Sequence, residues 1–231
     1  FMAALMTSDA DDTDRLAIEI SACKKMGIEV LGPNANASYK NFAIIPNETK
    51  IRFGLLAVKS VGAGAVDAVL QARKIDGKFT TVLEFAKRVN GKMFNKRAWD
   101  SLIMTGAFDE FGTRSDLLFN LEKIQGYGIK LQKEALSGQV DLFSSLGETG
   151  QNMKIEPEIE LQTAPKQHTE KEQLMWERDL LGLYVSAHPL DKYASYFEEQ
   201  TLPLSQVQPS FDSQKATIGG IVIDARTIIT K

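Results

Sequence analysis

Apolar residues repeat at helical spacing near the start of the chain. A polar run over residues 8–14 is followed by Leu16, Ile20 and Cys23, which share one helix face, and then by Gly27. Acidic and hydroxyl side chains cap helix starts, and glycine commonly follows a helix end. The pattern predicts a capped amphipathic helix that ends near Gly27.

Short apolar runs replace the helical spacing in the next part of the chain. The run over residues 28–31 stops at Gly32 and Pro33, which end any regular element. Residues 42–45 and 51–53 are two further apolar runs on either side of a Pro-Asn turn. These two runs predict a β hairpin.

Short helices are predicted from Gly54 to about Ile124. Thr81 and Glu84 have the spacing of a capping box, and Asn95 stands where an N-cap precedes an apolar helix face. The apolar residues of that face are Ala98, Trp99, Leu102 and Ile103.

The last third of the sequence changes character twice. Residues 144–166 are rich in Gly, Pro and Glu, which is typical of an exposed linker. Thr169 and Glu172 form a second capping box, and the helix that they open should include Tyr184 and end before Pro189. Residues 216–229, rich in Ile, Val and Thr, predict the first strand or two of a β domain. The expected fold class is therefore mainly α with a small β part (α+β).

Length and composition are those of an ordinary globular protein. The chain has 231 residues, 43% of them hydrophobic and 25% charged, enough for two or three small domains. It has no apolar run of the roughly 18 residues needed to cross a membrane. The lone Cys23 cannot form an internal disulfide, and no signal peptide is present, so we expect a cytoplasmic protein. Since Phe1 begins in mid-pattern and Lys231 lies within an expected strand, we expect a piece of a longer polypeptide.

Charge is distributed unevenly along the chain, whose formal net charge is -3. Residues 1–49 hold 4 Lys and Arg against 7 Asp and Glu, residues 50–97 hold 11 against 3, and residues 98–231 hold 12 against 20. The middle stretch is thus strongly basic, and Lys96 and Arg97 at its end are candidate phosphate contacts. Solvated helix faces are the alternative explanation of such a charge run.

A turn of small residues lies inside the basic stretch, between two apolar segments with helical spacing. Glycines let the backbone approach a phosphate, and the amides at the start of the following helix lie at its positive dipole end. Such contacts hold DNA without reading its sequence. The alternative is a purely structural turn. The turn residues that we expect to contact DNA are Lys59, Ser60, Val61, Gly62, Ala63 and Gly64.

A weaker copy of this turn follows 50 residues later. The shift superimposes Gly112, Thr113 and Arg114 on the first turn, which predicts a tandem helix-hairpin-helix with these three residues as further DNA contacts. The copy is degenerate, because Asp116 and Asn120 fall on apolar positions of the first hairpin. An ordinary connection between helices is the alternative.

No set of residues predicts catalysis or metal binding. Asp9 and Asp11 imitate the start of a calcium loop, but Asp14 occupies the position that needs glycine. His168 and His188 have no paired spacing for a zinc site, and no phosphate-binding loop of a nucleotide hydrolase is present. We therefore expect no catalytic residue, no metal and no cofactor in this stretch.

Several collinear stretches resemble the bacterial replicative DNA polymerases of the C family. They lie at residues 1–7, 53–62, 95–109 and 180–191, the last of which reads Leu-Leu-Gly-Leu-Tyr-Val-Ser-Ala-His-Pro-Leu-Asp. The resemblance covers essentially the whole chain and is weakest over the predicted linker.

The resemblance implies a domain order. It assigns residues 1–50 to the end of a fingers domain, 51–135 to a tandem helix-hairpin-helix domain that holds duplex DNA, and 136–166 to a clamp-binding motif and linker. Residues 167–215 would be a connecting helical segment, and 216–231 the start of an OB domain. The polymerase's catalytic aspartates and Mg²⁺ ions would lie upstream, so this stretch should not polymerise alone.

The resemblance also draws attention to residues 139–143. They resemble the pentapeptide with which this family binds its sliding clamp, the β subunit. Two adjacent apolar anchors can enter a preformed pocket while a glutamine supplies directional hydrogen bonds. Packing of the apolar pair on neighbouring helices is the alternative. The expected clamp contacts are Gln139, Asp141, Leu142 and Phe143.

The leading hypothesis is a region that holds duplex DNA by its backbone and tethers a sliding clamp, which supports processive synthesis. Its expected partners are duplex DNA, the clamp and other polymerase holoenzyme subunits, with no membrane. A tandem helix-hairpin-helix module of a repair or recombination protein is the alternative. A purely structural helical scaffold is a third possibility, which the concentrated basic stretch disfavours.

Overall fold

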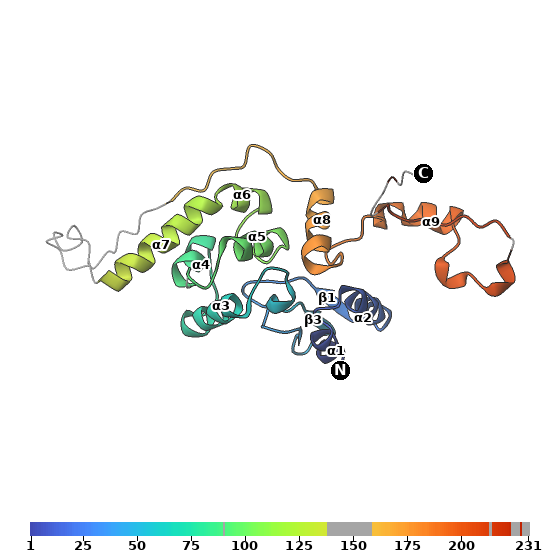
Figure 1. Ribbon diagram of the computed structural model, residues 1–231, viewed down its shortest axis with the longest axis horizontal. Coiled ribbons are helices and arrows are strands. Elements are labelled where there is room, and N and C mark those ends of the chain that lie inside the picture. The colour runs from blue at the N-terminus through green and yellow to red at the C-terminus, as the bar shows by residue number, and fades with distance from the viewer. Residues whose placement is uncertain (90, 138–158, 213, 223–226, 228–231) are drawn as a thin grey trace. The chain divides into compact units, whose positions relative to one another are not determined.

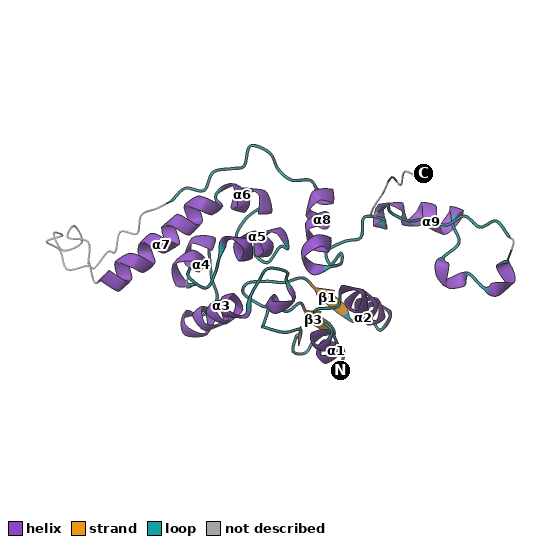
Figure 2. Ribbon diagram, in the orientation of Figure 1, coloured by secondary structure: helices purple, strands orange, loops and turns teal. Residues whose placement is uncertain are grey.

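The computed structural model describes residues 1–89, 91–137, 159–212, 214–222 and 227 (Figure 1). The chain divides into two compact units, Phe1–Ser186 and Ala187–Lys231. Helices predominate among the described residues, and the strands lie in the first unit (Figure 2). The predicted class, mainly α with a small β part, is confirmed.

Two helices open the first unit, α1 (Met2–Ser8) and α2 (Thr13–Lys25). The side chain of Asp12 caps α2 by accepting hydrogen bonds from the Asp14 and Arg15 amides, at 3.2 and 3.1 Å. Leu16 and Cys23 are buried, and Gly27 follows the helix with a left-handed φ of 72°. The predicted capped helix is confirmed.

A three-stranded sheet follows, in the order β1 (Glu29–Leu31), β3 (Lys50–Arg52), β2 (Ala43–Ile44). The β2–β3 pair is antiparallel, as predicted for the hairpin, and β1 pairs with β3 in parallel. The sheet delivers the chain to Gly54, where a Cβ atom would collide with the backbone of Asn41. Only glycine fits at this exit.

The rest of the first unit is helical, and none of the described helices is long and apolar enough to cross a bilayer. A 3-10 turn, η1 (Leu55–Ala57), comes directly after the sheet. The α-helices that follow it are α3 (Ala63–Asp76), α4 (Val82–Arg88), α5 (Lys96–Met104), α6 (Arg114–Phe119) and α7 (Leu121–Ser137).

The predicted caps are present at α4 and α5. Thr81 accepts from the Glu84 amide at 3.1 Å, and Asn95 accepts from the Ala98 amide at 2.9 Å. The capping box at α4 is incomplete, because the Glu84 carboxylate bonds the amide and hydroxyl of Thr80 instead of the Thr81 amide. This bonding also helps to lower the pKa of Glu84, where burial acts in the opposite direction.

An aromatic cluster holds these helices together. Phe85 on α4 lies at its centre, with its ring centroid 4.8 Å from that of Phe108, 5.1 Å from that of Trp99 and 5.3 Å from that of Phe94. All four side chains are at most 4% exposed. Beside the cluster, α4 packs on α7 so closely that a Cβ atom at Gly128 would collide with a backbone carbonyl.

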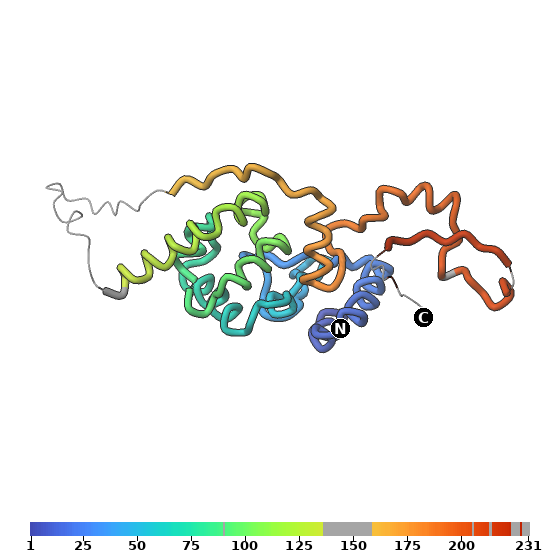
Figure 3. Tube along the Cα trace, turned by 45° about the horizontal axis from the view of Figure 1, so that its top comes forward, coloured from blue at the N-terminus to red at the C-terminus, as the bar shows by residue number. Residues whose placement is uncertain are grey.

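Residues 159–168 reach α8 (Glu170–Leu181) by running alongside α6, as Figures 1 and 3 show. The predicted capping box of Thr169 and Glu172 is complete. The helix ends at Leu181, earlier than predicted, because Gly182 adopts a left-handed φ of 82°. Tyr184 therefore lies outside it.

The second unit contains α9 (Ala194–Gln200) and three 3-10 turns, η3 (Asp191–Tyr193), η4 (Leu204–Gln206) and η5 (Pro209–Phe211). Of the β segment predicted over residues 216–229, the described residues 216–222 form no strand. A strand forms only where a neighbour supplies the ladder of hydrogen bonds. Here one bond, from the Leu202 amide to the Thr217 carbonyl at 2.8 Å, joins this segment to the turn after α9.

Candidate nucleic-acid interface

The first predicted hairpin turn has an unusual backbone at Ser60. This residue adopts φ 67°, in the left-handed region that few non-glycine residues enter, and Val61 after it is only 5% exposed. Gly62 then serves as the N-cap of α3 with an extended backbone. The left-handed residue and the buried valine thus fix how the chain enters α3.

The arm before the turn differs from the prediction. We expected an α-helix around Leu55 and Val58, but η1 is a single 3-10 turn, and Val58 leaves it with an extended backbone. This turn begins directly after Gly54 and ends at Ala57, three residues before Ser60. One arm of the hairpin is thus short, and α3 is the long one.

The start of α3 is open to solvent. No side chain caps it, and among the described residues the amides of Gly62, Ala63 and Gly64 donate to no protein acceptor. A Cβ atom at Gly62 would meet nothing within 4 Å. Unpaired amides at a helix start lie at the positive end of the helix dipole and suit an anion.

Exposed cations lie near this helix start. Lys59 is anchored through its backbone amide, which donates to the Leu180 carbonyl at 3.0 Å, while its side chain is exposed. Arg97 is exposed on the first turn of α5. Lys96 beside it lies 3.5 Å from the Glu122 carboxylate, a solvent-exposed pair of small energetic weight.

The connection that precedes α5 lies beside the start of α3. A Cβ atom built on Gly64 would lie 3.6 Å from the sulfur of Met93, so Met93 lies beside the turn. Met93 is two residues from Asn95, a span of at most roughly 7 Å. We call residues 59–64 and 95–97 together the hairpin surface.

Two arginines of the basic stretch are used inside the protein. Arg73 donates to the Ala35 carbonyl at 3.0 Å and lies over the Tyr39 ring, and burial lowers its pKa. Arg88 donates to the carbonyls of Ala72 and Gly77 at 2.7 Å. These guanidinium groups bind the ends of loops and helices, so the basic stretch presents less positive surface than its charge count indicates.

The start of α6, in the second hairpin, is capped by a protein side chain and is not open to an anion as the start of α3 is. Gly112 has a φ of 153°, and Thr113 caps α6 by accepting from the Asp116 amide at 3.2 Å. The Asp116 carboxylate then accepts from the Ala164 amide at 2.7 Å and from the Gln167 side chain at 2.8 Å. These hydrogen bonds, the one from Ala164 above all, lower the pKa of Asp116.

The chain segment that covers α6 falls partly in the predicted linker. Asn120 exchanges two hydrogen bonds with the backbone of Gln162, at 2.7 and 3.0 Å, and the Ser115 hydroxyl lies 2.9 Å from both the ring Nδ1 and the amide of His168. Of residues 162–166, Ala164 is buried and the other four are exposed. This part of the predicted linker is nevertheless bound at Gln162 and Ala164 by the side chains of Asn120 and Asp116. An acidic residue and a covering segment at its start make the second hairpin a poor phosphate site.

Arg114, which we expected to contact DNA, has a buried side chain instead. Its side chain is 9% exposed and pairs with Asp109 at 2.9 Å and with Glu177, on α8, at 3.2 Å. Burial opposes the charged form, but the hydrogen bonds and charges of these two carboxylates outweigh it and raise the pKa of Arg114. A buried, paired guanidinium cannot reach DNA, so Arg114 joins α6 to α8 instead.

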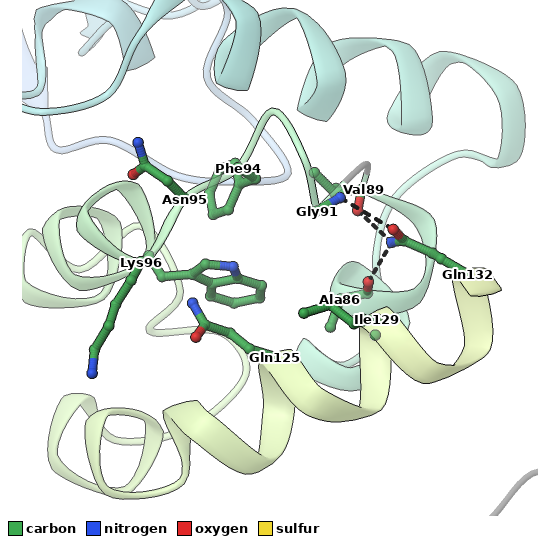
Figure 4. A pocket seen from close by; sticks show the side chains of 11 residues that line it. Ala86, Val89, Gly91, Phe94, Asn95, Lys96, Gln125, Ile129 and Gln132 are labelled. Atoms are coloured by element: carbon green, nitrogen blue, oxygen red, sulfur yellow. Dashed lines mark hydrogen bonds between the residues drawn. The ribbon is translucent and has the colours of Figure 1, made fainter.

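A pocket of about 160 Å³ lies beside the α4–α5 connection (Figure 4). Trp99 and Phe94 line one wall, and Gln125 and Ile129 of α7 line another. Gln132, also on α7, donates to the carbonyls of Ala86 and Val89 at 3.0 and 2.7 Å and accepts from the Gly91 amide at 3.2 Å. This side chain, which sequence reasoning did not identify, fixes the connection that carries Met93.

The expected clamp contacts, Gln139, Asp141, Leu142 and Phe143, lie outside the described residues. Within the described residues, no three His, Cys, Asp or Glu side chains come together to hold a metal ion.

A small-residue turn between a short arm and the longer α3, together with the open start of α3, defines the class of this element as helix-hairpin-helix. The family model described as "Helix-hairpin-helix motif" matches residues 27–117, which include both turns.

The chain is also similar to curated proteins over most or all of its length. It is 38% identical over 192 residues, 83% of the chain, to DNA polymerase III subunit alpha of Saccharopolyspora erythraea. It is 35% identical to that of Haemophilus influenzae and 33% identical to that of Escherichia coli K12, in both cases over the whole chain. The chain spans 16–20% of the length of these relatives. It belongs to the DNA polymerase III subunit alpha family, as a segment of that protein.

Proposed function

We propose that the hairpin surface holds the sugar-phosphate backbone of duplex DNA within a DNA-directed DNA polymerase. The observation that carries the proposal is the uncapped start of α3, where three consecutive amides lack protein acceptors in the described part of the chain. Unpaired amide donors at a helix start suit a phosphate oxygen. The contact involves no base edge, so it holds any sequence.

The cations of the hairpin surface supply the long-range part of the interaction. Lys59, Lys96 and Arg97 are exposed on or next to the two helix starts. A polymerase must hold newly made duplex of every sequence while the duplex moves past, and backbone contacts suit that task. Arg114 is no longer part of the set, and Gly112 and Thr113 contribute less than the first turn because Asp116 lies beside them.

The test is the salt dependence of duplex binding. The parent chain should bind duplex DNA with an affinity that falls steeply with salt. Reversing three charges, Lys59→Glu, Lys96→Glu and Arg97→Glu, should reduce the slope of log affinity against log salt by roughly three, about 0.9 for each lost phosphate contact. Fluorescence anisotropy with a labelled duplex measures both quantities.

The matched control reverses three lysines at other helix ends, Lys24→Glu, Lys25→Glu and Lys74→Glu. Lys24 and Lys25 lie in the last turn of α2, and Lys74 lies in the last turn of α3. This variant has the same net charge as the test variant. Equal slopes for the two variants would mean that total charge, not the hairpin surface, governs binding.

The proposal includes a tether to the sliding clamp through residues 139–143, in the cytoplasm and alongside other polymerase subunits. Its support is the sequence Gln-Val-Asp-Leu-Phe, which begins two residues after α7 ends at Ser137. Leu142→Ala with Phe143→Ala should lower affinity for the clamp by roughly tenfold or more, because both apolar anchors are lost. Surface plasmon resonance with immobilised clamp measures this loss.

A conservative control accompanies the tether test. Val140→Ala changes the residue between the expected contacts and should leave clamp affinity within about twofold, since a non-anchor position contributes little. Unchanged affinity after loss of Leu142 and Phe143 would remove the tether from the proposed function, while the DNA-holding role would stand.

A further inference from the structure

Met93 is an exposed apolar residue beside the hairpin turn. Its side chain is 58% exposed, and its sulfur lies next to Gly64. Lys92 precedes it, and Lys96 and Arg97 follow closely. This apolar side chain thus lies beside the open start of α3, among basic residues of the sequence, but is itself unsuited to a phosphate.

The backbone on both sides of Met93 is fixed. Phe94 is 3% exposed and belongs to the aromatic cluster, with its ring centroid 5.3 Å from that of Phe85. Two residues before Met93, the Gly91 amide donates to Gln132 at 3.2 Å. The chain is thus pinned inward immediately after Met93 and just before it. Met93 is presented outward at small cost in conformational entropy on binding.

We propose that Met93 contacts the apolar edges of deoxyribose sugars in the minor groove of the duplex. The inference rests on the proposed function of the hairpin surface. Where amides and cations hold phosphates, the next DNA atoms that an adjacent side chain meets are the sugars, whose C–H edges line the minor groove. Methionine is suited to this role because its thioether side chain is flexible, apolar and adaptable.

This role has a property that separates it from the cationic contacts. Sugars carry no charge, so covering them releases no counterions. Every nucleotide offers the same sugar edge, so the contact does not depend on sequence. Met93 should therefore contribute affinity without contributing to the salt slope.

The test compares three variants of the full chain. Met93→Ala should weaken duplex binding roughly fivefold to tenfold, since it removes most of the apolar area that the contact covers, and should leave the salt slope unchanged. Met93→Leu should restore most of the affinity. Met26→Ala is the control, because Met26 is 61% exposed at the end of α2, away from the turn.

The possible outcomes separate this inference from the proposed function. Salt-dependent binding by the parent chain with no loss in Met93→Ala would overturn the role of Met93 alone. A loss accompanied by a lower salt slope would also overturn it, because the residue would then act through charge or through the turn. Failure of the parent chain to bind duplex DNA would overturn both proposals.

The groove itself can be tested with an iron chelate attached at Met93→Cys. The natural Cys23 is buried, so the label should attach at position 93. Radicals released in the minor groove produce cuts on the two strands that are offset toward their 3′ ends, and we expect this pattern. A 5′ offset, typical of the major groove, or no cleavage above that of a chelate at Met26→Cys, would contradict the proposal.

Discussion

Buried arginines are the main polar links of the first unit. Arg114 joins the second hairpin to α8 through Glu177, whose side chain is 2% exposed. Glu177 in turn accepts hydrogen bonds from the amides of Val185 and Ser186, at 3.2 and 3.0 Å. A planar guanidinium can serve several acceptors at once, which a lysine cannot do with the same geometry. This ion pair therefore links α6 to α8 and, through Glu177, to the segment after it.

Removal of the Arg114 side chain should lower the free energy of unfolding and should leave DNA binding unchanged. Arg114→Met leaves Glu177 buried without its partner, so we expect the free energy of unfolding to fall by about 3–5 kcal/mol. Adding Glu177→Gln to Arg114→Met removes the orphaned charge and should recover part of the loss. Urea denaturation of both variants measures these changes.

The same pair of variants tests the reassignment of Arg114. The double variant should bind duplex DNA with the parent's salt slope, because the guanidinium does not face solvent. A slope lower by about one would return Arg114 to the set of phosphate contacts. A stability loss under about 1 kcal/mol for Arg114→Met would contradict the buried network.

Sequence reasoning at this scale identified residue types but not the direction in which they point. It placed Arg73, Arg88, Lys59 and Arg97 in one basic stretch. Burial then depends on carbonyl groups brought from elsewhere, such as that of Ala35 for Arg73, and no local pattern contains this information. The exposed lysines and the buried arginines look alike until the fold is known.

At the scale of elements, the sequence predicted the helix caps, because a cap depends only on residues close to it in the chain. The caps at Asp12, Asn95 and Thr169 lie within three residues of the amides that they bind, so they were predictable. The shortness of η1 was not, because the apolar residues around it have helical spacing in the sequence.

Long-range hydrogen bonds hold part of the predicted linker. Residues 159–166 have linker composition, and they form no helix or strand. The backbone groups of Gln162 and Ala164 are nevertheless bound by Asn120 and Asp116, which are more than 40 positions away. In the sequence, Asp116 and Asn120 are the two polar residues that make the second hairpin a degenerate copy of the first. In the structure they are the acceptors and donors that hold this segment.

At the scale of the whole molecule, the expected boundary near residue 50 does not separate two cores. One buried cluster runs from Met6 and Leu16 on the first helices through the sheet to the aromatic cluster around Phe85 and on to Leu183. The turn at Ser60 is thereby supported by residues from the whole first unit. In the second unit no described side chain is buried, and the role expected for residues 216–231 stays a prediction.

The most direct test of the account is to remove one backbone donor from the hairpin turn without changing any charge. Ala63→Pro does this, because proline lacks the amide hydrogen, is favoured at the first position of a helix and suits the extended backbone of Gly62 before it. We predict roughly tenfold weaker duplex binding, the value of one charge-assisted hydrogen bond, with thermal stability equal to or above the parent's. Unchanged affinity in a folded Ala63→Pro chain would contradict the claim that the amides at the start of α3 hold the DNA backbone.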